Sequence, residues 1–235
     1  MTLSTHSTLS STVAVIDYGM GNLHSVAKAL EHANAHAKIL LTSDKQQIAN
    51  ADRVILPGVG SIRDCIGEME RLDLVDSIKQ AAATKPFLGI CIGMQALMTH
   101  SAENEGVNCL DIIPGEVERF SDQLSDPLAR GAAADHHLKI PHMGWNQVNQ
   151  QIKHPLWQNI TQNQRFYFVH SYFVVPQSPE PIAGSTIYGH PVCVALAQEN
   201  IFATQFHPEK SSDAGLQLFA NFIDWDGTYN ASTNC

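Results

Sequence analysis

The 235-residue sequence lacks several features that define large classes of proteins. Its five cysteines form no Cys-x-x-Cys pair, and an odd count without paired spacing predicts reduced thiols and a cytoplasmic protein. Lys and Arg number 14 against 23 Asp and Glu, with no basic cluster, so nucleic acid and anionic membranes are poor partners. No apolar run approaches the roughly 20 residues of a membrane span.

The N-terminal residues have neither the basic nor the apolar stretch of a secretory signal, and they lack the arginines of a transit peptide. We interpret residues 1–12, rich in Ser and Thr, as a disordered extension. Residues 13–224 form one expected domain, and residues 225–235 form a C-terminal tail that is expected to be frayed from Asp226 to Cys235. The hydrophobic fraction of 44% and the charged fraction of 16% are typical of a globular protein with an ample core.

The first half of the chain alternates apolar runs with helical patterns. Strands are expected at 13–17, 37–41, 53–56 and in the run before Gly89, and helices at 23–33, 62–71 and 74–83. This order predicts an α/β fold with an open, mostly parallel sheet and flanking helices. From about residue 108, short runs between Pro, Gly and Asn predict an added antiparallel portion, and a last helix is expected at 214–223.

A cysteine lies at the tip of a predicted strand–turn–helix. The segment Gly89-Ile90-Cys91-Ile92-Gly93 is a thiol version of the G-x-S-x-G nucleophile elbow. The turn leaves no room for side chains at both flanks, which glycine tolerates. The pattern predicts that Cys91 projects into solvent at a helix N-terminus, where partial positive charge favours the thiolate. A buried structural cysteine is the alternative interpretation.

The segment His207-Pro208-Glu209 follows the last predicted strand. Residues two apart in an extended segment point to the same side, so Glu209 can orient the His207 ring. Alone, this tripeptide also fits a simple strand-end turn. Together with Cys91 it supplies nucleophile, base and orienter, which favours acyl transfer.

A developing oxyanion at this site would need hydrogen-bond donors. We expect one from the backbone N–H of Ile92, which directly follows the nucleophile. A second is expected from the loop Pro57-Gly58-Val59-Gly60, whose glycines let the backbone approach closely or flip. The predicted oxyanion residues are therefore Ile92, Gly58, Val59 and Gly60.

The elbow through Gln95 and the segment 205–211 resemble the class I glutamine amidotransferases. The segments 16–23, 141–146 and 167–172 narrow the resemblance to the glutaminase subunits of imidazole glycerol phosphate synthase, from histidine biosynthesis. The match runs from about 13 to 223. It implies that Cys91 attacks the carboxamide of glutamine, that His207 protonates the leaving ammonia and that Glu209 orients His207. It also implies that glutamine is held by Gln95, His170, Ser171 and Tyr172.

The resemblance further implies a partner. In the family, ammonia passes to a separate (β/α)-barrel synthase subunit, bound as a heterodimer, which makes imidazole glycerol phosphate and an aminoimidazole carboxamide ribotide. The implied docking residues are Asn22, Met143, Trp145 and Asn146. An exposed Met-Gly-Trp in a Pro-rich turn is also a typical interface anchor, although a Trp filling a core gap is the alternative.

The sequence has no P-loop, no metal-ligand spacing and no basic phosphate site, so it offers no place for a phosphorylated acceptor. We expect no cofactor and no metal site. Asp135-His136-His137 with His142 is a candidate metal cluster, but adjacent histidines in a strand point to opposite faces and chelate poorly together. The remaining internal cysteines are interpreted as small core residues, namely Cys65, Cys109 and Cys193.

Three alternative functions stay open. A glutaminase subunit of another class I enzyme would be expected to lack the His-Met-Gly-Trp-Asn segment. A cysteine peptidase or thiol sensor on a similar fold would leave Gln95 and the 170–172 segment without a task. A non-catalytic interaction subunit would tolerate replacement of Cys91 by serine with no activity to lose.

Overall fold

The structure, a computed structural model, describes residues 11–125 and 137–229. Its strands, in chain order, are β1 Thr12–Ile16, β2 Lys38–Thr42, β3 Arg53–Leu56, β4 Phe87–Ile90, β5 His100–Ser101, β6 Val107–Asn108, β7 Gly115–Arg119, β8 His142–Gln150, β9 Gln164–His170, β10 Tyr172–Pro176, β11 Ile182–Tyr188, β12 His190–Gln198 and β13 Ile201–Thr204. Its α-helices are α1 Leu23–Ala33, α2 Lys45–Asn50, α3 Ile62–Arg71, α4 Val75–Thr84, α5 Ile92–Gln95 and α6 Ser212–Asp224. Single 3-10 turns are η1 Glu103–Glu105, η3 Pro155–Trp157 and η4 Pro208–Lys210.

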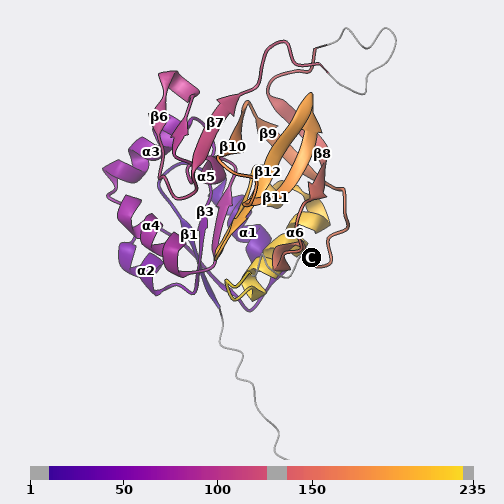
Figure 1. The fold of residues 1–235 in the computed structure, drawn as a ribbon. Helices are drawn as coiled ribbons and strands as arrows, with labels where there is room; N and C mark the ends of the chain where they lie inside the picture. Colours follow the sequence, from indigo (N-terminus) through magenta and orange to yellow (C-terminus); the bar gives the residue numbers. More distant parts are fainter. Residues whose placement is uncertain (1–10, 126–136, 230–235) are drawn as a thin grey trace, which may run out of the picture.

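The strands form one mixed sheet (Figure 1), in the order β2-β1-β3-β4-β13-β12-β10-β7-β5-β6. From β2 to β13 the neighbours are parallel, and β13 pairs antiparallel with β12. Strand β11 joins β12 to β8, and β8 pairs with β9 as a long antiparallel ribbon. The predicted fold class, a mostly parallel α/β sheet with an antiparallel portion, is confirmed.

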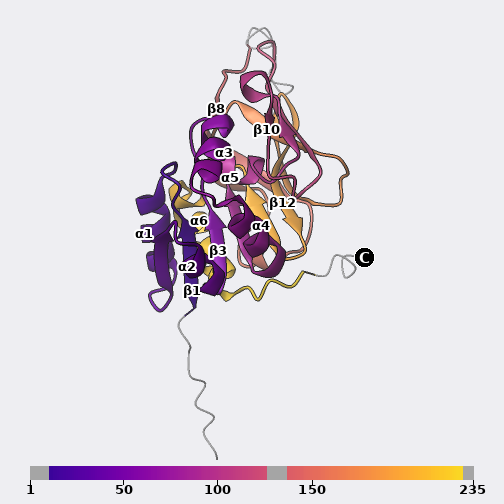
Figure 2. The same cartoon turned by 90° about the vertical axis from the view of Figure 1, so that its left-hand side faces the viewer.

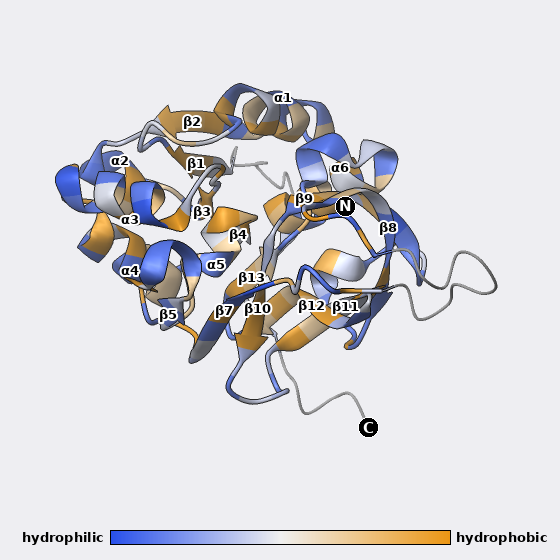
Figure 3. Cartoon of the chain, turned by 90° about the horizontal axis from the view of Figure 1, so that it is seen from above, coloured by the Kyte–Doolittle hydropathy of each residue, from blue (hydrophilic) through white to orange (hydrophobic). Residues whose placement is uncertain are grey.

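Helices cover both faces of the parallel half. Helices α1 and α6 pack together on one face, whereas α2, α3 and α4 lie on the other (Figures 2 and 3). This cover explains why β1 reads as a continuous apolar run, because a strand buried on both faces needs no polar alternation. The carboxyl ends of β3, β4 and β13 meet at one edge of the sheet, where α/β proteins place their chemistry.

Several elements differ from the sequence-based expectations. Helix α2 was not expected, because its six residues bury only Ile48 and leave no periodic pattern to detect. Strand β11 was also missed. The Met143-Gly144-Trp145 segment lies on β8 and not in a turn, since its residues pair with Val169, Phe168 and Tyr167 of β9.

The chain end packs further than expected. Trp225 is buried, and its indole N–H donates to the carbonyl of Thr228 over 2.8 Å. The Tyr229 ring lies 4.8 Å from the His154 ring, centroid to centroid. The expected fraying from Asp226 is therefore wrong as far as Tyr229. Residues 1–10 of the predicted extension and 230–235 of the tail lie outside the described residues.

Other sequence expectations concern cysteines, metal and membrane. Cys65 is fully buried, as expected, whereas Cys109 and Cys193 are only partly buried. Within residues 11–125 and 137–229, no group of three or more His, Cys, Asp or Glu side chains could hold a metal ion. Asp135 and His136 of the candidate cluster fall outside that part of the chain. No helix in the described part is long and apolar enough to cross a membrane.

Candidate active site

The segment around Cys91 has the backbone of a nucleophile elbow. Cys91 adopts φ 55° and ψ −108°, a strained conformation that side chains rarely take. Its N–H donates to the carbonyl of Thr204 on β13 over 2.7 Å. A Cβ at Gly93 would lie 1.8 Å from the carbonyl oxygen of Leu56, and one at Gly89 2.9 Å from the oxygen of Gly93. The predicted elbow is confirmed, and close packing is what demands both glycines.

Two expectations about the elbow are wrong. Cys91 does not project into solvent, because only 4% of the residue is exposed. The helix that follows is a single turn, Ile92–Gln95, since the apolar residues Ala96, Leu97 and Met98 enter the core without continuing it. One short turn supplies little of the helix dipole that was expected to act at this position.

The His207 ring and the Glu209 carboxylate form a buried pair. The ring Nδ1 lies 2.8 Å from Glu209 Oε1, and the two side chains are 2% and 1% exposed. The contact was predicted, although its geometry differs. Glu209 lies in the 3-10 turn η4 and not in an extended segment, and Ser211 Oγ donates to the carbonyl of His207 over 2.7 Å to brace that turn.

Opposing effects set the protonation of His207. Burial lowers its pKa, but interactions with the Cys91 thiol and the Glu209 carboxylate outweigh burial and raise the pKa to about 10. The second ring nitrogen, Nε2, is buried and makes no hydrogen bond of normal geometry with any described residue. The site can therefore hold an imidazolium beside Cys91, with Nε2 available to hand a proton to a leaving group.

Two glutamines connect the wall of the site to the nucleophile. Gln95 Nε2 donates to Gln205 Oε1 over 2.9 Å and to the carbonyl of Tyr172 over 3.2 Å. Gln205 Nε2 in turn lies 3.7 Å from Cys91 Sγ. Gln95 Oε1 is buried without a partner in the described structure, so Gln95 keeps one acceptor for a bound ligand.

His170 lines the same site, but both of its ring nitrogens are engaged within the protein. Nδ1 lies 2.7 Å from the carbonyl of Tyr172, and Nε2 lies 2.9 Å from His142 Nδ1. The ring therefore has no free donor or acceptor for a ligand. Its geometry favours an indirect part in the implied binding of glutamine, through the Tyr172 carbonyl.

The predicted oxyanion loop lies against the elbow. The N–H of Ile92 donates to the carbonyl of Gly58 over 3.4 Å, so the expected oxyanion donor faces a protein acceptor. The N–H of Val59 belongs to the same peptide as that carbonyl and points the opposite way. A Cβ at Gly58 would lie 2.6 Å from the Tyr18 hydroxyl and 2.8 Å from Cβ of Ile92, so the loop approaches this closely only with glycine.

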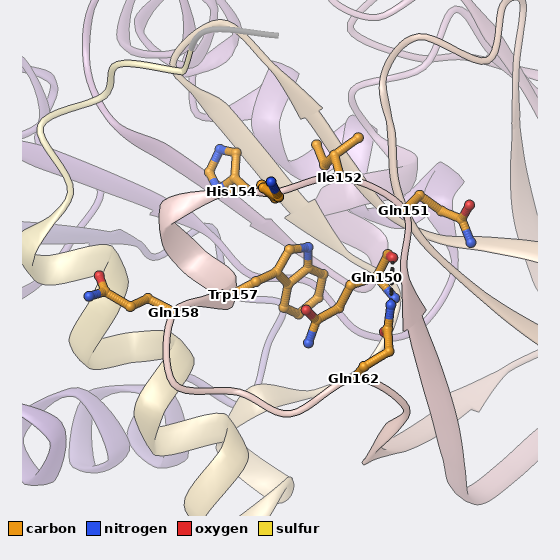
Figure 4. A pocket seen from close by; sticks show the side chains of 8 residues that line it. Gln150, Gln151, Ile152, His154, Trp157, Gln158 and Gln162 are labelled. Carbon is orange, nitrogen blue, oxygen red and sulfur yellow. Dashed lines mark hydrogen bonds between the residues drawn. The ribbon is translucent and has the colours of Figure 1, made fainter. Parts of the chain in front are cut away.

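One cavity of about 590 Å³ gathers most of the predicted residues, a size that suits a small ligand. The predicted residues that line it are Asn22, Val59, Gly60, Cys91, Ile92, Gln95, His170, Ser171, Tyr172 and His207. Gly58 and Glu209 are not among its lining residues. A second cavity, shown in Figure 4, is lined mainly by glutamines together with His154 and Trp157. It contains no nucleophile or carboxylate, so the first cavity is the candidate active site.

The predicted docking residues fall in two places. Asn22 lines the cavity of Cys91. Met143 and Trp145 lie on β8 and are 61% and 50% exposed, which excludes the alternative of a tryptophan filling the core. Together with Asn146 they line a neighbouring hollow, where Ile187 of β11 is also 48% exposed. This exposed apolar surface is of the kind that marks interaction sites.

Sequence reasoning assigned no role to several residues of the site. Gln205 stands two residues before His207, and strand alternation from His207 was a signal that could have found it. Tyr18 donates to the carbonyl of Pro57 over 2.6 Å and so holds the oxyanion loop. Lys210 and Glu103 also line the cavity. Tyr18 and Lys210 stand in the segments 16–23 and 205–211 that carry the resemblance, whereas no sequence pattern distinguishes Glu103 from an ordinary surface position.

The geometry of the site defines a class of protein. A thiol on a strained elbow, beside a buried His–Glu pair at the carboxyl ends of parallel strands, marks an α/β protein that can transfer acyl groups through a thiol. Residues 14–225 match the family described as Glutamine amidotransferase class-I. The chain belongs to the class I glutamine amidotransferase family.

Curated relatives are similar over nearly the whole chain. A protein of Pseudomonas putida named imidazole glycerol phosphate synthase subunit HisH is 54% identical, covering 93% of this chain and 99% of that protein. A protein of the same name from Nitrosococcus oceani is 55% identical, with 92% and 99% covered.

Solved structures agree on the fold. The structure of PurLQS from Thermotoga maritima matches with a TM-score of 0.67 at 17% identity, covering 92% of this chain and 99% of that one. A crystal structure described as a glutamine amidotransferase gives 0.64 at 16% identity, with 91% and 99% covered. At such identities these two likenesses concern the fold alone.

Proposed function

We propose that this chain is the glutaminase subunit of an imidazole glycerol phosphate synthase in histidine biosynthesis. The observation that carries the proposal is the His207–Glu209 pair at 2.8 Å beside Cys91 on its elbow, in a cavity of suitable size. The relatives that share about half of its residues and bear the name HisH support the pathway.

In the proposed reaction, the Cys91 thiolate attacks the carboxamide carbon of glutamine. The C–N bond breaks as His207 gives a proton to the nitrogen, which leaves as ammonia. The resulting glutamyl thioester is attacked by water, with His207 as base, and glutamate leaves while Cys91 is regenerated. Glu209 holds Nδ1 of His207 and stabilises the imidazolium.

Glutamine binding is assigned to residues around the cavity. The unpaired Oε1 of Gln95 would accept from a donor of glutamine, and Ser171 and Tyr172 line the same cavity beside it. His170 would act indirectly, through the Tyr172 carbonyl.

The contact between Ile92 N–H and the Gly58 carbonyl supports low activity in the isolated chain. In that arrangement neither proposed oxyanion donor faces the reacting carbonyl, and one lost donor costs about 2.7–4 kcal/mol of barrier. A (β/α)-barrel synthase subunit, docked on Asn22 and the exposed face of β8, would turn the Gly58–Val59 peptide and receive the ammonia.

The test is ammonia release from glutamine by the purified chain, with and without the barrel synthase and its ribotide ligand. Cys91→Ala should abolish release, whereas Cys109→Ala, which removes a partly buried thiol elsewhere, should leave it unchanged. Release that depends on Cys91 but ignores the barrel synthase would assign the chain to another class I amidotransferase. No release under any condition would return it to an interaction role.

A further inference from the structure

A series of buried and part-buried hydrogen bonds runs from strand β8 to the candidate active site. It starts at Asn146, whose Nδ2 lies 3.2 Å from His142 Nε2. His142 Nδ1 lies 2.9 Å from His170 Nε2, and His170 Nδ1 lies 2.7 Å from the Tyr172 carbonyl. That carbonyl also accepts from Gln95, which bonds Gln205 beside Cys91. None of these contacts is needed to build the sheet.

The groups at the two ends of this hydrogen-bond series, the Tyr172 carbonyl and Asn146, determine which nitrogen of each histidine ring carries the proton. The Tyr172 carbonyl can only accept, so His170 carries its proton on Nδ1 and leaves Nε2 bare. His142 must then donate from Nδ1, which leaves its own Nε2 bare as well. Asn146 fits this end, because its Nδ2 supplies two protons, one toward His142 and one to the Ile187 carbonyl at 3.0 Å.

The surroundings keep both rings neutral and fixed. Burial, followed by the neighbouring His170, lowers the pKa of His142 to about 3, and burial lowers that of His170 to about 4. The His142 ring is stacked between Phe168 and Tyr188, with centroid distances of 4.7 and 4.0 Å. Neutral rings keep one donor and one acceptor each, which is what a one-directional chain requires.

The two ends of the chain lie in different cavities. His142 and Asn146 line the hollow that also exposes Met143 and Trp145, whereas His170 lines the cavity of Cys91. We propose that the His142–His170 pair is a positioning relay that connects strand β8, on the face opposite the exposed Met143 and Trp145, to the glutamine site. Resting on the proposed function, this inference adds that the relay fixes the Tyr172 carbonyl and thereby the amide of Gln95.

The first test is nitrogen NMR of the imidazole rings in the full-length wild-type chain at neutral pH. We expect both His142 and His170 to carry the proton on Nδ1. A proton on Nε2 of either ring would overturn the relay whatever the chain's activity, because donor and acceptor would then be reversed. The tautomers test the direction of the hydrogen bonds in the relay, and the kinetic variants below test whether the relay acts on glutamine binding.

The second test is steady-state ammonia release in the complex with the barrel synthase. His142→Phe keeps a flat ring between Phe168 and Tyr188 but removes both hydrogen bonds. Its KM for glutamine should rise about three- to tenfold, the effect of one neutral hydrogen bond, while kcat stays within about twofold. The matched control is His190→Phe, which alters another ring packed on Phe120 but outside the relay, and should change neither constant.

A second variant covers the case in which His142→Phe does not fold. Asn146→Asp replaces the donor facing His142 Nε2 with an acceptor, so the His142 ring should gain a proton on Nε2 in the NMR spectrum and KM should rise. Unchanged KM in the folded variants would overturn the proposed relay. Absence of ammonia release by the wild-type complex would instead overturn the proposed function, and the relay with it.

Discussion

The N–H of Ile92 donates to the carbonyl of Gly58 over 3.4 Å, so the loop 57–60 closes the elbow that it is expected to assist. Two side chains contact backbone carbonyls of this loop. Tyr18 donates to the Pro57 carbonyl over 2.6 Å, and the Cys65 thiol lies 3.5 Å from the Val59 carbonyl. Loosening this hold should change how readily the Gly58–Val59 peptide turns.

Tyr18→Phe should therefore raise the glutaminase activity of the isolated chain. The change removes the buried hydrogen bond to Pro57, which is worth about three- to tenfold in the balance between closed and turned loops. Ammonia release without the partner measures the effect, and release by the complex, where the loop is already turned, serves as the control. A decrease in the isolated chain would show that Tyr18 supports the turned loop instead.

Glu209→Gln should reduce kcat by about 10²- to 10⁴-fold, because an amide can hold Nδ1 of His207 but cannot stabilise the imidazolium. The fall in kcat should come with a lower pKa of His207, which NMR titration can follow. Glu70→Gln, on the exposed side of α3, is the matched control and should be silent. If the Glu209 variant kept a tenth of the activity, the pair would not have the proposed role.

Gly93, the second glycine of the elbow, is the position where we expect a substitution to destabilise the fold most. Gly93→Ala would place a Cβ 1.8 Å from the Leu56 carbonyl oxygen, which only a backbone shift can relieve, so a loss of more than about 3 kcal/mol in the free energy of unfolding is expected. Gly67→Ala, in open space on α3, should instead stabilise by about 0.5–1 kcal/mol. Urea unfolding of both variants compares them directly, and equal stabilities would contradict the packing argument.

Acid should destabilise the fold through its buried histidines. Burial lowers the pKa of His154 from 6.5 to about 3. Between these two pH values, His154 is protonated in the unfolded chain but stays neutral in the folded chain. Stability must then fall as the pH drops from 6.5 toward 3. His154→Asn keeps an acceptor for the Leu156 N–H but does not titrate, so wild type should lose about 1.4 kcal/mol per pH unit more than this variant. Parallel stability curves between about pH 6 and 4 would rule this out.

The sequence was sufficient to predict those parts of the site whose structure is determined by residues close together in the chain. The glycines around Cys91 and the spacing of His207 and Glu209 allow few arrangements, and the structure has the elbow and the pair. The depth of Cys91 was not predictable, because it depends on strands far away in the chain. The same holds for the Met143-Gly144-Trp145 segment, whose strand pairing is set by β9 and not by its own residues.

The relay histidines, His142 and His170, show more clearly that contacts between distant segments could not be predicted from the sequence. His142 was considered only as a metal ligand and His170 only as a contact for glutamine, since a sequence shows which residues can bond but not which of them meet. Gln205 shows the opposite case. It stands in the 205–211 segment that carries the resemblance, and alternation from His207 would have placed it on the side of the nucleophile, although no role was assigned to it.

The position of β13 has a consequence for how the protein is made. This strand inserts between β4 and β12, and it carries both the carbonyl that anchors Cys91 and the approach to His207. While the chain is being synthesised, the edge of β4 that pairs with β13 therefore stays unpaired and apolar until nearly the whole sequence has left the ribosome. A prematurely ended chain would expose that edge and have no working site, so it would be inert as an enzyme and prone to aggregate.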